Sequence, residues 1–274
     1  MPLFILCLAL AASLHAQPLT LSWSNNMLRV TGPNLPGGYL DTWYLEAFCR
    51  GGSTDRDWNK TTIPHQTEKL SASPQKIALR TRVEPGIVVE HEILARADEV
   101  EFKLVARNTG DSFVDVQWFQ PCVRVDRFTG GNQKDYIEKS FIFTQDGLKF
   151  LHQLPRAEEA IYRGGQVYVP PGIPMADVNP RPISTIRPAN DLIGCVSKDG
   201  QQLFATAWDS TQELFQGVIV CLHNDPRIGG LKPGETKELR GKFYILPNDP
   251  QKLLERYRRD FPSSRSQSEK TISP

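Results

Sequence analysis

The stretch that decides the fold class is residues 76–106, KIALRTRVEPGIVVEHEILARADEVEFKLVA. Its turn signal, Glu84-Pro85-Gly86, separates two strand-like runs, Lys76–Val83 and Ile87–Leu94. In the second run every other residue is one that a sheet buries, which predicts a strand with one face in a core. These residues are Ile87, Val89, His91 and Ile93. The run Glu99–Ala106 alternates in the same way, so the stretch predicts an antiparallel meander.

Further strand-like runs lie on both sides of this meander. They are Leu19–Trp23, Met27–Thr31, Tyr39–Cys49, Phe113–Phe119, Leu192–Ser197, Leu203–Trp208, Gly217–Leu222 and Thr236–Ile245. The segment Thr129–Asp191 is dense in proline and glycine. Because proline removes a ladder donor, we expect long ordered loops there, with short strands near Ser140–Thr144 and Gly165–Tyr168.

One helix is expected near the C-terminus, at Pro250–Asp260, with Asn248 or Asp249 as its cap. We therefore predict an all-β fold: a large antiparallel β-sandwich, or supersandwich, with long proline-rich loops and one C-terminal helix. It forms a single domain over residues 17–261. Residues 262–274 are polar and rich in serine, so we expect a disordered tail.

The first sixteen residues, MPLFILCLALAASLHA, contain no Asp, Glu, Lys or Arg. Their apolar run is shorter than the roughly 20 residues of a transmembrane helix and is typical of an export signal that is cleaved after Ala16. An N-terminal strand or a buried helix is the alternative. We expect a secreted or periplasmic protein that is soluble and has no membrane partner once the signal is removed.

The charges nearly balance, with 32 basic and 31 acidic residues, so there is no electrostatic reason to expect nucleic acid as a partner. The sequence holds no C-x-x-C pair, P-loop, G-x-G-x-x-G, H-E-x-x-H or G-x-S-x-G pattern, and we expect no cofactor and no metal. Four cysteines follow the signal: Cys49, Cys122, Cys195 and Cys221. They can form disulfides in an oxidising compartment or remain buried thiols. No pattern specifies the oligomeric state.

Two stretches carry a resemblance to a known family. Residues 90–126, EHEILARADEVEFKLVARNTGDSFVDVQWFQPCVRVD, run from a strand through an Asn-Thr-Gly turn into a second strand, and residues 231–246 read LKPGETKELRGKFYIL. Both resemble the galactose-mutarotase-like supersandwich, and the whole chain is similar to a group of secreted bacterial proteins. The resemblance implies a sandwich with a concave sugar-binding face. Epimerases of that family use histidines and a carboxylate, but their spacing is not found here, so no residue role is carried over.

The first candidate site follows a strand end. It offers carboxylates, a guanidinium and an indole, the mixture that binds sugar hydroxyls and covers the apolar side of a sugar ring. Its residues are Glu46, Arg50, Asp55, Asp57 and Trp58, followed by His65, which we favour as a proton-transfer residue because a polar loop leaves it accessible. A surface loop whose charges pair with one another is the alternative.

Two further stretches contribute candidates. Alternation in residues 117–127 places Arg124 and Asp126 on one strand face with Gln120, and Val123 and Val125 on the other. Gln117 and Arg127 of the same stretch are further candidates for binding a sugar. In the second stretch, His223 and Asp225 sit where a strand breaks at Pro226, and two ligands are too few to indicate a metal. Supporting candidates are Asp177, Asn179, Arg181, Trp208, Gln212, Glu213 and Gln216. The alternatives are a solvent-face ion pair for Arg124 and Asp126 and a structural turn for His223.

Two classes of function remain open. In the first, the protein binds carbohydrate and acts on it by epimerase-, lyase- or hydrolase-like acid–base chemistry, with His65, His223, Asp126 and Asp225 as catalytic candidates. In the second, it is a non-catalytic extracellular interaction or structural module. Convergence of the three stretches in one cleft would favour the first class.

Overall fold

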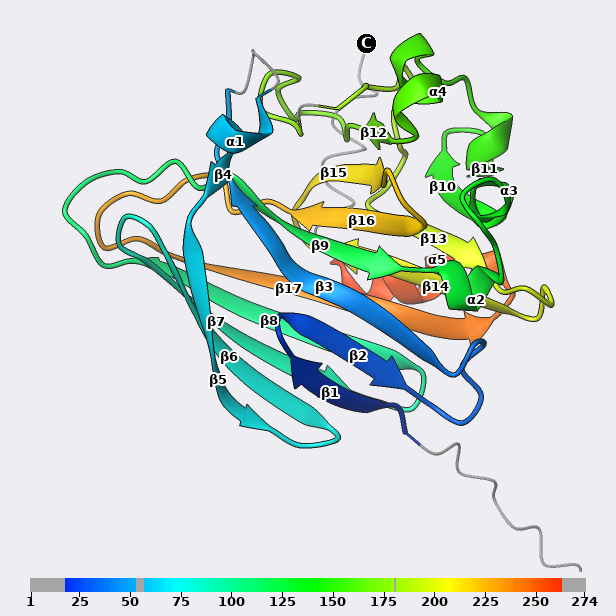
Figure 1. Ribbon diagram of the computed structural model, residues 1–274, viewed down its shortest axis with the longest axis horizontal. Coiled ribbons are helices and arrows are strands. Elements are labelled where there is room, and N and C mark those ends of the chain that lie inside the picture. Colours follow the sequence, from blue (N-terminus) through cyan, green and yellow to red (C-terminus); the bar gives the residue numbers. More distant parts are fainter. Residues whose placement is uncertain (1–17, 53–56, 180, 263–274) are drawn as a thin grey trace, which may run out of the picture.

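The computed structural model describes residues 18–52, 57–179 and 181–262. The expected export signal, Asp55 and most of the expected polar tail lie outside these residues. The described chain forms two large antiparallel sheets packed face to face, so the predicted all-β sandwich is confirmed (Figure 1). No helix in the described part of the chain combines the length and apolar character needed to cross a membrane.

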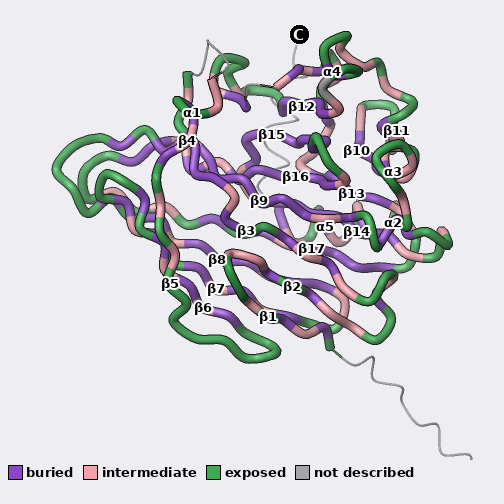
Figure 2. Tube along the Cα trace, in the orientation of Figure 1, coloured by how far each residue is buried: buried purple, intermediate pink, exposed green. Residues whose placement is uncertain are grey.

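The first sheet, sheet A, has the order β1-β2-β3-β9-β16-β15-β12, with β4 beside β3. Its strands are β1 Thr20–Ser24, β2 Met27–Thr31, β3 Tyr39–Cys49, β4 Thr62–Ile63, β9 Trp118–Arg124, β12 Gln166–Tyr168, β15 Thr211–Gln216 and β16 Cys221–Pro226. Its central strands β9, β15 and β16 are buried along nearly their whole length, which means that this sheet is covered on both faces (Figure 2).

The second sheet, sheet B, has the order β11-β10-β13-β14-β17-β8-β7-β6-β5. Its strands are β5 His65–Ala72, β6 Lys76–Val83, β7 Ile87–Ala95, β8 Glu99–Asn108, β10 Ser140–Thr144, β11 Gly147–Phe150, β13 Ile193–Val196, β14 Gln202–Trp208 and β17 Thr236–Pro247. The predicted meander of residues 76–106 is the run β6–β7–β8, and its burial alternates residue by residue as the sequence indicates.

The long helix α5, Pro250–Asp260, has the predicted bounds. Asp249 caps it by accepting hydrogen bonds from the backbone N–H groups of Gln251 and Lys252. The other helices are short: α1 Trp58–Thr61, α2 Asp126–Thr129, α3 Asp135–Lys139, α4 Glu158–Arg163 and the 3₁₀ turn Leu151–Gln153. All of these except α1 lie in or next to the proline-rich segment (Figure 1).

Four packing clusters place these elements. The main core lies between the sheets, and a second cluster lies between sheet B and α5 through Leu253 and Tyr257. On the outer face of sheet A, Val167, Val169, Val178 and Phe215 form a third cluster. The fourth is formed by Ala47, Cys49 and Trp118 with Trp58 of α1 packed against them. Sheet A is therefore buried on its outer side by α1 and by the loops around residues 167–183.

Three strand predictions need correction. The predicted strand Phe113–Phe119 starts at Trp118, and the predicted strand Gly217–Leu222 is instead β16, Cys221–Pro226. His65, expected in a polar loop, instead begins edge strand β5, whose mostly exposed side chains hide the strand period. His223 and Asp225 consequently lie inside a buried strand rather than at its break.

Candidate functional site

Buried polar side chains gather on the outer face of sheet A. We call this group the polar cluster: Glu46 of β3, Gln120 of β9, Glu213 of β15, and His223 and Asp225 of β16. All except Glu46 are almost completely buried, and the Glu46 side chain is 25% exposed. Buried ionisable groups are costly unless they are paired, so a concentration of them on one sheet face marks a candidate site.

The strand period explains how β16 contributes to this cluster. Leu222 points into the main core, so Cys221, His223 and Asp225 point to the opposite, outer face. On β15, Glu213 is directly opposite Asp225 and Phe215 is opposite His223. The imidazole of His223 packs against the Phe215 ring, with the ring centroids 5.0 Å apart.

A bulge in β3 turns Glu46 toward the same face. The pairing of β3 with β9 shifts register between Trp43 and Ala47. Tyr44 and Leu45 both pack into the main core, so the alternation is interrupted and Glu46 reaches the outer side. Bulges that re-aim one side chain are common beside functional sites.

His223 is at the centre of the cluster. Its Nδ1 lies 3.9 Å from Glu46 Oε2 and 3.9 Å from Asp225 Oδ1, and Gln120 Nε2 is 3.1 Å away. Burial lowers the pKa of His223, but its contacts with Cys122, Glu46 and Glu213 outweigh burial and raise the pKa above the ordinary value. The imidazole is therefore held close to carboxylates on its Nδ1 side.

Glu213 and Asp225 form a buried carboxyl pair across β15 and β16. The backbone N–H of Asn179 donates to Glu213 Oε2 at 2.8 Å. Burial raises the pKa of Glu213 to about 7, and burial together with the neighbouring Glu213 raises the pKa of Asp225 well above its usual range. Each carboxylate disfavours the ionisation of the other, so the pair favours a state in which at least one of the two carboxyls is protonated.

An open cleft of about 560 Å³ lies between β3 and α1. We call it the β3–α1 cleft, and its lining includes Trp43, Glu46, Arg50, Trp58 and His65. Asp57 does not line it but caps α1, accepting from the N–H of Asn59 at 3.0 Å. Glu46 is the residue that joins this cleft to the polar cluster.

His65 lines the cleft at the start of β5. Its Nε2 and Nδ1 lie 3.3 Å from the Leu45 carbonyl and 3.4 Å from the Ile63 carbonyl, and its ring meets Phe48 edge-on. The imidazole is thus held by the backbone rather than by a carboxylate. This arrangement fits a residue that shapes the cleft wall.

The stretch 117–127 divides between two places. Arg124, Asp126 and Arg127 line a separate hollow of about 350 Å³ with Tyr39 and Asp41, where the Arg127 guanidinium stacks on the Tyr39 ring. This hollow lies at the start of β3, whereas the β3–α1 cleft lies at its end. The expected convergence of the three stretches therefore holds for Glu46, His223 and Asp225 but not for the residues of this hollow.

Three other predicted site residues are held by packing or hydrogen bonds within the protein. Trp208 is fully buried in the main core against Phe102 and Phe119, so it is not available to a ligand. Gln216 is also buried and donates to the Gly164 carbonyl at 2.7 Å. Gln117 donates to Asp115 Oδ1 at 2.5 Å. We correct the assignment of Trp208 and Gln216 as sugar-binding residues on these grounds.

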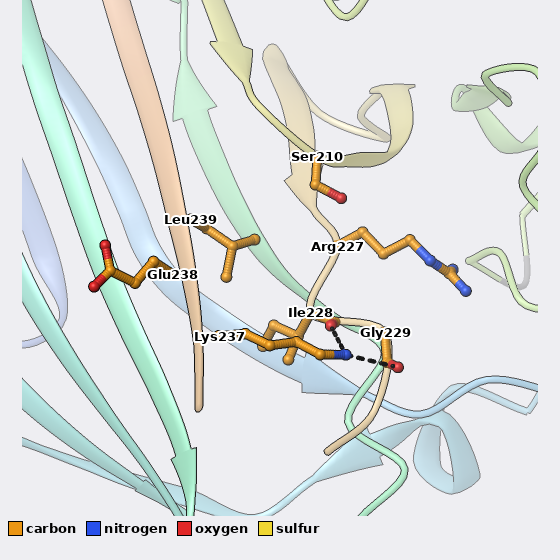
Figure 3. A pocket seen from close by; sticks show the side chains of 7 residues that line it. All are labelled: Ser210, Arg227, Ile228, Gly229, Lys237, Glu238 and Leu239. Atoms are coloured by element: carbon orange, nitrogen blue, oxygen red, sulfur yellow. Dashed lines mark hydrogen bonds between the residues drawn. The ribbon is translucent and has the colours of Figure 1, made fainter. Parts of the chain in front are cut away.

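A further hollow of about 480 Å³ lies beside β17, lined by Arg227 and Lys237 among others (Figure 3). The Lys237 ammonium donates to the carbonyls of Ile228, Gly229 and Gly230. The Arg227 side chain points away from Lys237 (Figure 3). It donates to Gln212 of β15 and lies 3.7 Å from the Asp177 carboxylate. Both cations are already engaged by protein groups, so this hollow has less to offer a ligand than the β3–α1 cleft.

Sequence reasoning missed Trp43 and the two thiols Cys122 and Cys221 as neighbours of the site. The alternation Cys221-x-His223-x-Asp225 was the signal that could have placed three polar side chains on one face, had the strand been extended through Pro226. The register of β9 against β16 then brings Cys122 opposite His223.

The chain matches no protein-family model and no curated protein. Solved structures do resemble it. The galactose mutarotase related enzyme of Lactobacillus acidophilus has a TM-score of 0.45 at 10% identity, covering 83% of this chain and 97% of that one. A galactose mutarotase-like protein of Lactobacillus casei ATCC 334 has a TM-score of 0.43 at 8% identity, covering 83% of this chain and 99% of that one. Galactose 1-epimerase of Lactobacillus acidophilus NCFM has a TM-score of 0.40 at 8% identity, covering 85% of this chain and 99% of that one. The expected likeness to galactose-mutarotase-like structures is therefore found, and no residue role is taken from it.

Proposed function

We propose that this protein is a carbohydrate-binding sandwich that takes a sugar in the β3–α1 cleft and transfers protons to or from it through Glu46. The observation that carries the proposal is the position of Glu46. Its carboxylate lines an open cleft on one side, and on the other it lies 3.9 Å from a buried imidazole that a carboxyl pair flanks.

The cleft has the chemistry that a sugar ring requires. Trp43 is 38% exposed, and Trp58 packs against the fourth cluster with its ring available to the cleft, so indole surface is present for the C–H side of a pyranose. Arg50 supplies donors for hydroxyl groups in pairs. The cleft volume of about 560 Å³ accommodates one or two sugar rings.

The arrangement favours proton transfer over two-carboxylate hydrolysis. A glycosidase places two carboxyl groups on opposite sides of the scissile bond, about 5–9.5 Å apart. Among the described residues that line the cleft, Glu46 is the acidic one, and Glu213 and Asp225 lie together behind His223 rather than across the cleft. In our scheme Glu46 contacts the substrate, and His223 positions it.

Binding and turnover are tested separately on the full chain. Isothermal titration with a panel of aldoses and short glycans measures binding, and polarimetry of freshly dissolved α-aldoses measures mutarotation. We expect Trp58→Ala to weaken binding about tenfold or more, the equivalent of about 1.4 kcal/mol of lost stacking. Glu46→Gln should keep binding within a few-fold and slow mutarotation by about 10²–10⁴-fold.

Two controls are matched to these changes. Tyr162→Ala removes an aromatic ring that is 83% exposed on α4, and Glu90→Gln removes a surface carboxylate that pairs with Arg80. Both should behave as the unchanged protein. If the unchanged protein binds a sugar and the Trp58→Ala variant binds it equally well, the β3–α1 cleft is not the binding site. A protein that binds no aldose or glycan at all would favour the non-catalytic interaction module.

A further inference from the structure

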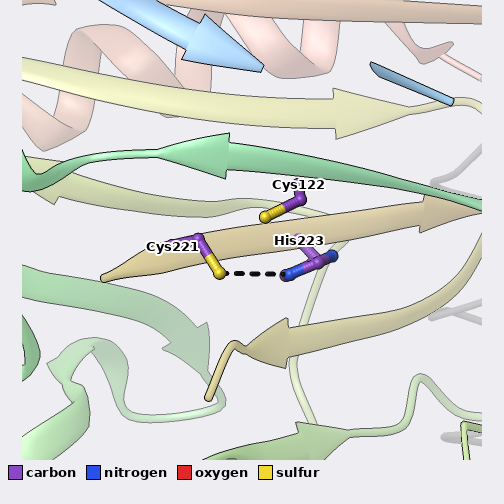
Figure 4. A group of neighbouring side chains, drawn as sticks. All are labelled: Cys122, Cys221 and His223. Carbon is purple, nitrogen blue, oxygen red and sulfur yellow. Dashed lines mark hydrogen bonds between the residues drawn. The ribbon is translucent and has the colours of Figure 1, made fainter. Parts of the chain in front are cut away.

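Three metal-ligating side chains meet on the outer face of sheet A, next to the polar cluster. The ligand atoms of Cys122, Cys221 and His223 all lie within 4.8 Å of one another, and all three residues are buried (Figure 4). Cys221 and His223 are two apart on β16 and so share a face. The pairing of Leu222 with Val123 places Cys122 of β9 opposite His223.

We propose that these three residues form a Cys₂His site for a thiophilic metal ion, zinc first of all. Thiolate and imidazole are the ligands that zinc prefers, and three protein ligands leave one position for water or a ligand. The site shares His223 with the proposed sugar chemistry but uses its other ring nitrogen, Nε2 instead of Nδ1, and the metal proposal does not depend on sugar binding.

The geometry fits such an ion. With zinc–sulfur and zinc–nitrogen bonds of about 2.3 and 2.05 Å, a tetrahedral centre holds sulfur and nitrogen about 3.5 Å apart. The distance from Cys221 Sγ to His223 Nε2 is 3.3 Å. This pair is already at the spacing that a zinc ion needs, and the Cys122 Sγ lies within 4.8 Å of both atoms, so a shift of at most about 1 Å completes the group.

The other side of the His223 ring is equipped to orient it. A histidine that binds metal through one nitrogen usually presents the other to a carboxylate or amide oxygen. Here Nε2 faces Cys221, while the Nδ1 side holds two carboxylates, Glu46 and Asp225, each 3.9 Å away, and the Gln120 amide, whose Nε2 donates to Nδ1 at 3.1 Å. Metal binding at Nε2 would place the imidazole proton on Nδ1, so the Gln120 N–H would have to turn aside and a carboxylate would accept from Nδ1 in its place.

The backbone of Gly217 closes one side of the group. A Cβ at this position would lie 2.2 Å from Cys221 Sγ and 3.2 Å from His223 Nε2. Only glycine leaves the thiol and the ring room to stand beside each other. Tyr136 holds this glycine in place by donating from its hydroxyl to the Gly217 carbonyl at 2.9 Å.

A thiol that coordinates a metal ion is deprotonated, and thiolate is the form of cysteine that binds zinc. Binding should therefore release about two protons for each ion.

The test uses the full chain, purified under reducing conditions and stripped with a chelator. We expect one Co²⁺ ion per chain, with the intense near-ultraviolet band of thiolate-bound cobalt, displacement by Zn²⁺, and release of about two protons in weakly buffered solution. Cys122→Ser and Cys221→Ser should abolish the band and weaken zinc binding by more than about a hundredfold. This exceeds the loss of affinity expected when only a residue that hydrogen-bonds a metal ligand is removed.

The matched control is Cys195→Ser, a buried thiol on β13 in the other sheet. It should bind cobalt as the unchanged protein does. The Trp58→Ala variant should also bind cobalt fully, which separates this site from the sugar cleft. If the serine variants fail to fold, X-ray absorption of the wild-type zinc form still identifies two sulfur and one nitrogen ligands. Wild-type protein without stoichiometric cobalt, equal loss in Cys195→Ser, or a Cys122–Cys221 disulfide in protein purified without reductant would each overturn the proposal.

Discussion

Asp191 lies where the start of β13 meets α5, and replacing it by asparagine should stabilise the protein at neutral pH. Its Oδ2 accepts a hydrogen bond from the Tyr257 hydroxyl at 3.1 Å. Burial raises the pKa of Asp191 to about 6 from the ordinary 3.8, and the nearby Asp209 adds to this, while the Tyr257 bond opposes it in part. Between about pH 4 and about pH 6 the folded chain therefore holds a proton at Asp191 that the unfolded chain has already lost.

The sign and size of the effect follow from this difference. Below about pH 4 both states are protonated at Asp191 and there is no penalty. As pH rises toward about 6 the folded state binds more protons than the unfolded state, so the free energy of unfolding falls, and above about 6 the loss is complete. The gap between 3.8 and about 6 corresponds to roughly 3 kcal/mol as an upper bound. Asp191→Asn keeps an acceptor for Tyr257 and removes the charge.

Urea unfolding at a series of pH values measures the effect. The difference between Asp191→Asn and the unchanged protein should be near zero at about pH 4 and grow to between one and about 3 kcal/mol at about pH 7. Other titrating groups are common to both proteins and cancel in this difference. Asp146→Asn, an exposed carboxylate in the β10–β11 turn, is the control. A difference that stays constant with pH, or a variant that is less stable at pH 7, would refute the reasoning.

Two predictions concern the ends of the domain. Asp249→Ala removes the cap of α5, in which Asp249 Oδ1 accepts from two backbone N–H groups at 3.1 Å, and should lower the free energy of unfolding by about 1 kcal/mol. Asp249→Ser should recover most of this in the same urea assay, and an unchanged alanine variant would contradict the capping role. We also propose that residues 1–16 direct export: expressed in a bacterial host, the exported protein should begin at Gln17 by N-terminal sequencing. Export of a chain that still begins at Met1 would argue against this.

Most of the fold could be predicted because its strands obey local rules. The run β6–β7–β8 alternates cleanly and has turn residues at its ends, and α5 combines a cap, a proline at its start and an apolar stripe. Edge strand β5 was missed because an edge strand with two exposed faces carries no hydrophobic period. The pairing of β3 with β9, far apart in sequence, is set by tertiary packing that no local pattern specifies.

The site could be predicted only in part. Glu46, His223 and Asp225 could be predicted as candidates, because they are polar residues within or at the ends of predicted strands. Their meeting depends on the bulge in β3 and on the continuation of β16 to Pro226, and neither feature has a local signal. The neighbouring thiol of Cys122 comes from another strand, so a search for closely spaced ligand pairs does not find it. Trp208 was misplaced because the sequence does not say which face of β14 an aromatic residue takes.

The position of β17 has a consequence for the order of assembly. This strand joins β14 to β8 in the middle of sheet B, although it follows every other strand in the described part of the chain. Without residues 236–247, β14 and β8 would each be left with an open hydrogen-bonding edge that can pair with another chain. A chain that stops before residue 236 should therefore aggregate rather than form a smaller domain.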